Sequence, residues 1–147
     1  MEKEIILKKE ITINAPVEKV WEALIKPEWT SKYMYNCDAI SDWKKGSPLI
    51  WKGHEDGKIY VKGNVVDIKP ENLLAFTTFD PNSELPDVPA NYTKVTYKLT
   101  GDHGKTKLSV TDGDFAKVGD GEKRFNESQS GWHMVLNKLK EEVEKQK

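Results

Sequence analysis

The sequence predicts an α+β fold in which a curved antiparallel sheet of about seven strands wraps around one long C-terminal helix. Residues 122–147 carry apolar side chains at helical spacing, whereas most of the chain before them alternates apolar and polar residues or forms short polar turns. A sheet with one polar face must bury its apolar face, and only the last helix is long enough to cover it. The sheet is therefore expected to curl around that helix.

The C-terminal helix is predicted from a stripe of side chains that recur at steps of three, four or seven residues. At 1.5 Å per residue, this helix spans roughly 35 to 39 Å, about the width of a small domain. Its start is ambiguous, because Asp120 is a candidate N-cap and Asn126 with Gln129 forms a competing capping box. Gly131 interrupts the stripe and indicates a close approach of a strand or a ligand to the helix. The stripe consists of Phe125, Gln129, Trp132, Val135, Leu136, Leu139 and Val143.

The N-terminal third is predicted to form one strand followed by two short helices. Alternating apolar residues favour a strand over residues 4–13. A helix is expected to start at Asn14, because Pro16 suits the first helical turn. Pro27 disfavours helical geometry at the residue before it and ends this helix. A second short helix is predicted over residues 28–35.

The middle of the chain is predicted to form antiparallel strands joined by short turns. The turns contain glycine with charged or polar neighbours. One longer connection, residues 80–92, contains three prolines and is long enough to suggest a functional loop such as a lid. The predicted strands are residues 38–43, 48–52, 58–68, 73–79, 94–100 and 106–112.

Length and composition predict a single domain over residues 1–147 with no disulfide. The 23 basic and 24 acidic residues give a net charge of −1, which provides no general attraction to nucleic acid or to anionic membranes. The chain has no apolar run of membrane-spanning length and no signal-peptide pattern. The lone Cys37 has no intrachain partner, so a reducing, cytoplasmic location is expected.

Residues spread along the chain also resemble a known family in their order and spacing. The pattern is similar to the family related to the C-terminal domain of the activator of Hsp90 ATPase, within the superfamily of START and birch-pollen-allergen-like (Bet v 1-like) domains. This resemblance covers nearly the whole chain and implies a helix-grip fold, the arrangement that the periodicities predict independently. One departure is Lys45, which precedes Gly46 where the family commonly has a second glycine. The matching residues are Ile13, Ala15, Pro16, Val20, Trp21, Leu24, Pro27, Gly46, Gly63, Val65, Pro70, Leu73, Val95, Thr106, Leu108, Gly131, Trp132, Leu136 and Leu139.

The resemblance implies a cavity between the sheet and the long helix, where relatives hold apolar molecules. Aromatic residues from alternating strands and from the helix are candidates for its wall, although a single aromatic is more often a packed core residue. Two residues of the second short helix are candidates for closing one end. The predicted ligand-binding residues are Met34, Tyr35, Trp51, Phe76, Phe79, Tyr97, Phe125, Gln129, Trp132 and Leu136.

The sequence predicts no catalytic residue, no metal site and no cofactor. His54 and His103 lie in glycine-containing turns, and His133 is expected beside the cavity rather than over it. No metal-ligand spacing, nucleophile elbow or phosphate-binding loop occurs. If the cavity contained a carboxylate for acid–base chemistry, Glu55, Asp112 and Asp114 would be the candidates at its mouth.

Three functions remain open at the level of sequence. The first is a non-enzymatic domain that binds a small apolar or amphipathic molecule. The second, implied only by the name-giving member of the family, is a partner that stimulates a chaperone ATPase. The third is a cyclase or hydrolase that acts on a sequestered hydrophobic substrate. A non-enzyme is favoured, as a monomer or weak homodimer whose partner is a small hydrophobic ligand or, alternatively, a chaperone.

Overall fold

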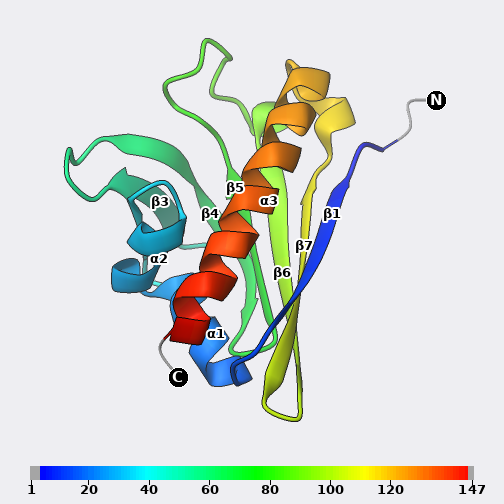
Figure 1. The fold of residues 1–147 in the computed structure, drawn as a ribbon. Coiled ribbons are helices and arrows are strands. Elements are labelled where there is room, and N and C mark those ends of the chain that lie inside the picture. Colours follow the sequence, from blue (N-terminus) through cyan, green and yellow to red (C-terminus); the bar gives the residue numbers. More distant parts are fainter. Residues whose placement is uncertain (1–3, 146–147) are drawn as a thin grey trace.

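The computed structural model describes residues 4–145 and confirms the α+β fold. Seven antiparallel strands form one sheet in the order β1-β7-β6-β5-β4-β3-β2, and the long helix α3 crosses it (Figure 1). The elements are β1 (Leu7–Ile13), α1 (Val17–Ile25), α2 (Pro27–Tyr33), β2 (Cys37–Ser41), β3 (Pro48–Gly53), β4 (Ile59–Lys69), β5 (Leu73–Thr78), the 3-10 helix η1 (Pro89–Asn91), β6 (Thr93–Asp102), β7 (Lys105–Gly113), the 3-10 helix η2 (Phe115–Lys117) and α3 (Gly121–Lys145).

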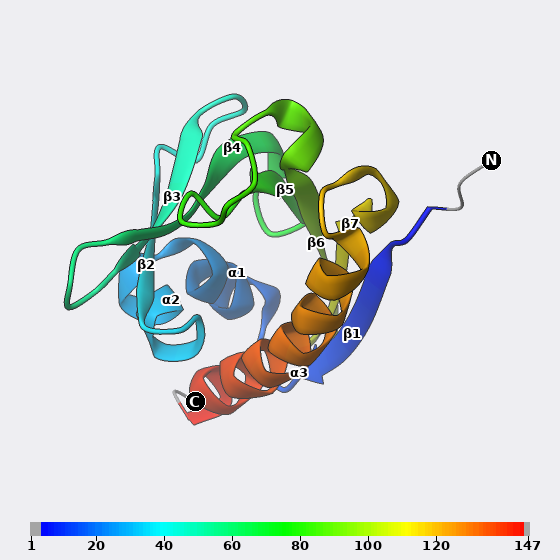
Figure 2. The same ribbon diagram turned by 90° about the horizontal axis from the view of Figure 1, so that it is seen from above.

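The sheet is strongly curved, and the helices complete a closed arrangement around its concave side. Seen from above, the strands form an arc, α3 closes the open side, and α1 and α2 lie near its C-terminal half (Figure 2). Polar contacts fix the C-terminal part of α3 to the end of β1. Lys140 Nζ donates to the Thr12 carbonyl at 2.8 Å, and the Asn14 amide donates to Glu144 Oε2 at 2.9 Å.

Several predicted boundaries differ from the structure by a few residues. Asn14 does not start a helix, because α1 begins at Val17 and Pro16 occupies the N-cap position in an extended conformation. The second helix begins at Pro27, one residue before the predicted start. The capping box of Asn126 and Gln129 is wrong, since α3 begins at Gly121 and contains both residues. Residues 146 and 147 of the predicted helix lie outside the described residues.

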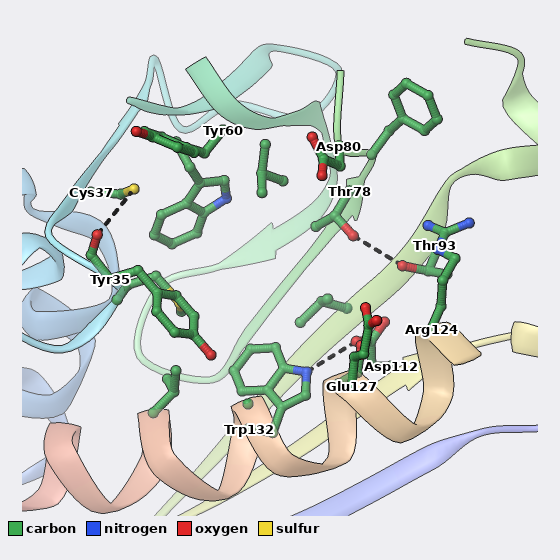
Figure 3. Close-up of a pocket in the computed structure, with 18 of the residues that line it drawn as sticks. Tyr35, Cys37, Tyr60, Thr78, Asp80, Thr93, Asp112, Arg124, Glu127 and Trp132 are labelled. Carbon is green, nitrogen blue, oxygen red and sulfur yellow. Dashed lines mark hydrogen bonds between the residues drawn. The ribbon is translucent and has the colours of Figure 1, made fainter. Parts of the chain in front are cut away.

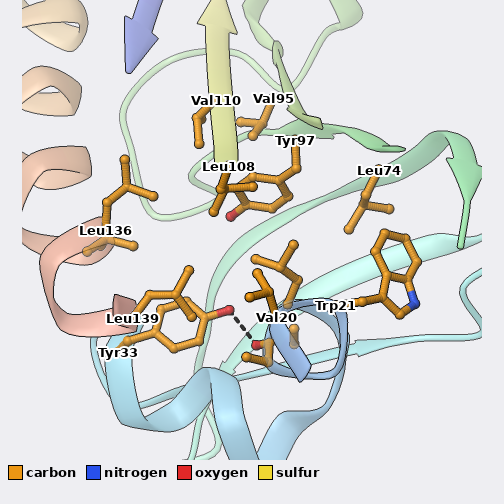
Figure 4. Packing of buried hydrophobic residues seen from close by; sticks show 14 of the residues in the cluster. Val20, Trp21, Tyr33, Leu74, Val95, Tyr97, Leu108, Val110, Leu136 and Leu139 are labelled. Atoms are coloured by element: carbon orange, nitrogen blue, oxygen red, sulfur yellow. Dashed lines mark hydrogen bonds between the residues drawn. The ribbon is translucent and has the colours of Figure 1, made fainter. Parts of the chain in front are cut away.

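The core packs between α1, α2, the C-terminal half of α3 and the concave face of the sheet (Figure 4). The α1 stripe predicted from the sequence supplies Val20, Trp21 and Leu24, all buried. Tyr33 from α2 is also buried, and its hydroxyl donates to the Ala23 carbonyl at 2.6 Å. Packed side chains therefore fill the space beside the C-terminal half of α3.

Candidate ligand-binding site

A pocket of about 620 Å³ lies between the concave face of the sheet and the N-terminal half of α3, and it is partly open to solvent (Figure 3). This volume falls within the range of small-molecule sites in proteins, roughly 300 to 1,000 Å³. Aromatic and aliphatic side chains form most of the wall, and a smaller group of polar side chains gathers on one part of it. The lining residues are Met34, Tyr35, Cys37, Trp51, Tyr60, Val61, Phe76, Thr78, Phe79, Asp80, Thr93, Val95, Asp112, Phe115, Arg124, Glu127, Ser128, Gly131, Trp132 and Val135.

Strand register arranges the sheet side of the pocket in rows. Phe76 of β5 pairs with Val95 of β6, which pairs in turn with Asp112 of β7, so these three residues form one row across the concave face. Side chains alternate between faces along a strand, so residues two positions away lie on the same face in neighbouring rows. Thr78 and Thr93 form the next row, and their hydroxyl oxygens are 2.9 Å apart.

The row on the other side of Phe76, Val95 and Asp112 belongs to the core. It contains Leu74, Tyr97 and Val110, which are all at most 1% exposed. Tyr97 packs against Phe76 with ring centroids 5.7 Å apart and against Trp132 at 5.8 Å. The sheet face therefore changes from apolar core, through a mixed row, to a polar row of threonines.

Trp132 and Asp112 join the helix to the sheet at the polar part of the wall. The Trp132 indole Nε1–H donates to Asp112 Oδ2 at 3.0 Å (Figure 3). Asp112 is only 5% exposed, and its other oxygen, Oδ1, is buried and makes no well-formed hydrogen bond within residues 4–145, although the Thr93 hydroxyl and the Gly113 amide are close enough to the carboxylate to lower its pKa. Desolvation raises the pKa of Asp112, against the opposing effects of Trp132, the Thr93 hydroxyl and Arg124. The carboxylate is thus held in a site that disfavours its charge.

Arg124 is the single cation among the described residues that line the pocket. Its guanidinium donates to the Asn91 carbonyl at 3.0 Å, which holds it against the loop of residues 80–92. Burial lowers the pKa of Arg124, while nearby carboxylates act in the opposite direction. These carboxylates belong to Asp112, Asp120, Asp80 and Glu127. The polar part of the pocket therefore contains more acidic than basic groups.

A side chain approaches the helix at Gly131, but it comes from the α2–β2 connection and not from the strand or ligand that the sequence predicted. A Cβ atom at this position would lie 2.8 Å from the hydroxyl oxygen of Tyr35, so the tyrosine would have to shift if residue 131 carried a side chain. Tyr35 itself has a positive φ of 51° and a side chain that extends from the α2–β2 connection toward α3 (Figure 3). Although Tyr35 lines the pocket, it is 60% exposed, so it forms part of the pocket rim.

Six of the ten predicted ligand-binding residues lie in the pocket wall, and their contact with a ligand stays a prediction. These six are Met34, Tyr35, Trp51, Phe76, Phe79 and Trp132. The other four lie elsewhere. Tyr97 is beneath the pocket in the core, Leu136 is buried in the same core, Phe125 packs against Phe115 with centroids 5.7 Å apart, and Gln129 is exposed.

Three predicted residues of α3 lie outside the pocket wall for one physical reason. The pocket-facing residues of α3 include Arg124, Ser128, Gly131 and Val135. Phe125, Gln129 and Leu136 each follow one of them by one position and are rotated by about 100° around the helix. Apolar spacing does not identify this face of α3, because Arg124, Ser128 and Gly131 are charged or small.

Other residues missed on the sheet had a usable signal. Thr78 lies two positions after Phe76, and Thr93 lies two positions before Val95, so period-two alternation places all four on one face.

The three carboxylate candidates for the cavity mouth lie in different places. Asp112 lies in the pocket wall. Glu55 is exposed in a turn away from the pocket, and Asp114 instead accepts from the Ile5 and Ala116 amides. Those two amides lower the pKa of Asp114.

The histidines lie outside the pocket. His54 is beside Asp38 with Nδ1 3.2 Å from Oδ1, His103 is exposed beside Asp102, and His133 is exposed on α3. Within residues 4–145, no group of three or more His, Cys, Asp or Glu side chains is arranged to hold a metal ion. In the same part of the chain, no helix combines the length and apolar character needed to cross a bilayer.

Comparison with known proteins places this architecture in a family. The family model described as "Activator of Hsp90 ATPase homolog 1-like protein" matches residues 14–144. The chain belongs to this family. A solution structure of ChR145 from Cytophaga hutchinsonii is 36% identical over 99% of this chain and 98% of its own, with a TM-score of 0.79. The search of curated protein sequences finds no match.

Two more distant structures share the fold. The solution structure of the Aha1 dimer from Colwellia psychrerythraea is 18% identical, with a TM-score of 0.73, and the match covers 95% of this chain and 96% of that one. DynU16, described as a putative protein in the dynemicin biosynthetic locus, is 20% identical with a TM-score of 0.75. The match covers 99% of this chain but 49% of DynU16, and likeness at this identity extends to the fold alone.

Proposed function

We propose that this protein binds a small amphipathic molecule in the pocket between the sheet and α3. The observation that carries the proposal is the graded wall of a pocket of about 620 Å³, which passes from aromatic side chains to a polar group. Phe76 and Trp51, with ring centroids 6.1 Å apart, would contact the apolar body of the ligand. Asp112, Thr93 and Arg124 would orient its polar end.

The arrangement supports binding over catalysis. Of the three acid–base candidates that the sequence offers, Glu55 is exposed outside the pocket, Asp114 accepts from two backbone amides, and Asp112 alone lines the pocket. One oxygen of Asp112 already accepts from Trp132. General acid–base catalysis of hydrolysis or cyclisation commonly needs a positioned proton donor together with a second group that activates a nucleophile. Three carboxylates and no histidine line the pocket within residues 4–145, and recognition of a ligand fits this set better than acid–base chemistry does.

The chaperone alternative has weaker support. It rests on the description of the family model, and the Colwellia neighbour is described as a dimer. Stimulation of a chaperone ATPase, self-association and a cytoplasmic location all stay predictions. Adding the protein to Hsp90 and measuring ATP turnover tests the first of them, and no change in turnover would remove it.

Native mass spectrometry of the purified protein, followed by organic extraction, tests the binding proposal. A stoichiometric small-molecule adduct is expected, either as purified or after incubation with a mixture of lipids and metabolites. Gly131→Leu places a side chain where Tyr35 and the pocket now lie, so this variant should lose the adduct. The matched control is Ser130→Leu, which introduces leucine at the exposed neighbouring position. This variant should retain the adduct.

Two results would contradict the proposal. One is wild-type protein that carries no adduct and acquires none from the mixture. The other is an adduct that the Gly131→Leu variant retains as well as the Ser130→Leu control does, since that ligand would be bound outside the pocket. Circular dichroism spectra of both variants establish that they are folded before binding is compared.

A further inference from the structure

The buried carboxylate of Asp112 is the least satisfied polar group in the pocket wall. The residue is only 5% exposed, and Oδ2 accepts the indole N–H of Trp132 at 3.0 Å. Its Oδ1 atom makes no well-formed hydrogen bond within residues 4–145. A buried polar atom without a partner lowers stability, so its retention in a pocket points to a partner supplied from outside the chain.

The charges around Asp112 indicate the chemistry of that partner. The lining residues include three carboxylates, Asp80, Asp112 and Glu127, and one cation, Arg124, among the described residues. Arg124 is partly engaged, because its guanidinium donates to the Asn91 carbonyl at 3.0 Å. A positive group that entered this part of the pocket would reduce the excess of negative charge, whereas a negative group would increase it.

Building on the proposed function, we infer that the ligand is a hydrophobic amine whose ammonium group pairs with Asp112. Its apolar body lies along Trp51, Phe76 and Val95, and its ammonium lies near the row formed by Thr78 and Thr93. Oδ1 is itself out of solvent contact, so pairing requires rotation of the carboxylate about its side-chain bond as the amine enters. The threonine hydroxyls accept further hydrogen bonds from the ammonium.

A neutral donor or an anion fits this environment less well. An alcohol donates one hydrogen bond to Asp112 but adds no positive charge to that of Arg124, which already donates to the Asn91 carbonyl. A carboxylate ligand has Arg124 as its one cationic partner in the described lining and meets three groups of its own sign. A buried charge is tolerated best when it is both paired and hydrogen-bonded, and an ammonium provides both for Asp112.

Three probes that differ only in their polar group test this inference. Isothermal titration at pH 7 compares 4-phenylbutylamine, 4-phenylbutan-1-ol and 4-phenylbutyrate as ligands of the wild-type protein, of Asp112→Asn and of Glu122→Gln. Glu122→Gln removes one negative charge at an exposed helix position outside the pocket lining, so it controls for the change in net charge. Wild type and Glu122→Gln should bind the amine at least about tenfold more tightly than the alcohol and should bind the carboxylate most weakly. Asp112→Asn should lose the preference for the amine.

The inference is overturned if the wild-type protein binds the alcohol or the carboxylate as tightly as the amine. In that case the proposed function still stands, because the pocket binds an amphipathic molecule. It is also overturned if Asp112→Asn keeps the full preference for the amine. If none of the three probes binds and mass spectrometry detects no adduct, the pocket is not a binding site, and both proposals fail together. The order of affinities in the wild-type protein is decisive even if Asp112→Asn does not fold.

Discussion

Individual residues in the pocket illustrate how a side chain gains a role from its neighbours. Asp112 ends a strand in which Leu108 and Val110, at the preceding same-face positions, are fully buried. Period-two alternation therefore carries the carboxylate to the buried face of the sheet, where the environment opposes its charge. The indole of Trp132 meets it from α3 and satisfies one oxygen only. This unsatisfied state costs stability.

Asp112→Asn is expected to stabilise the protein at pH 7 in the absence of ligand. Folding raises the pKa of Asp112 above its ordinary value of 3.8. The folded protein therefore loses stability as pH rises from 3.8 to the raised pKa, and the loss persists at higher pH. The neutral amide avoids this loss and keeps an oxygen for Trp132. The gain should be about 1 kcal/mol at pH 7 and should vanish below the ordinary pKa of the carboxyl, where both proteins are uncharged at this position.

Urea unfolding of the wild-type and Asp112→Asn proteins at pH 7 and near the ordinary pKa measures this difference. Glu55→Gln serves as the control here, since Glu55 is exposed in a turn and its substitution should leave the free energy of unfolding nearly unchanged. A less stable Asp112→Asn protein at pH 7 would show that the ionised carboxylate is already well compensated.

At the scale of elements, the loop of residues 80–92 is held at both ends. Near its start, Asn82 Nδ2 donates to the Ile59 carbonyl at 2.9 Å. Near its end, the buried Asn91 side chain donates to the Pro86 carbonyl at 2.8 Å and accepts from the Gly119 amide at 3.0 Å. The second set of contacts joins the loop to the connection that leads into α3. Whether this loop acts as a lid stays a prediction, and Asn91 is the contact that opening would have to break.

Asn91→Ala is expected to destabilise this loop by about 2 kcal/mol. The substitution removes both side-chain hydrogen bonds and leaves the Gly119 amide and the Pro86 carbonyl without their partners. Limited proteolysis should therefore cut within residues 80–92 faster than in the wild-type protein, and urea unfolding should report the loss of stability. Asn82→Ala is the matched control, because Asn82 is exposed and its contact is accessible to water. Equal cleavage of both variants would mean that Asn91 does not anchor the loop.

At the scale of the whole molecule, α3 serves two ends of the fold differently. Its C-terminal half is packed, with Leu136, Leu139 and Val143 at most 4% exposed. Its N-terminal half borders the pocket, where Trp132 is only partly buried and Gly131 has no side chain. One helix therefore joins a core that stabilises the fold to the wall of a pocket.

This division predicts different costs for two substitutions on the same helix. Leu139→Ala should lower the free energy of unfolding by 2 to 5 kcal/mol, roughly, because it opens a cavity in a packed core. Trp132→Ala should cost less than the 3 to 5 kcal/mol, roughly, typical of a fully packed indole, since part of its surface borders open space. Urea unfolding of both variants measures the costs. If Trp132→Ala cost the roughly 3 to 5 kcal/mol of a fully packed indole or more, the pocket end would be packed as tightly as the core.

Much of the fold was predictable because its elements follow from local spacing. The alternation in β6 and β7, the prolines around α1 and the stripe ending in Leu139 and Val143 each depend on residues close in sequence. The errors fell at element ends, such as the start of α1, where Pro16 rather than Asn14 occupies the N-cap position. End positions depend on single hydrogen bonds to distant residues, as Asn14 shows with Glu144, and sequence spacing does not encode these contacts.

The sequence by itself determined the order of the elements, the burial of the C-terminal stripe and the membership of aromatic residues in the interior, because periodicity decides which face of an element avoids water. Only the tertiary structure decided which buried residues face the pocket and which form its floor. Phe76 and Tyr97 look alike in sequence, yet strand register puts the first in the wall and the second beneath it. Register and helix rotation are set by contacts between distant segments, and those contacts placed Asp112, Arg124 and Trp132 in one site.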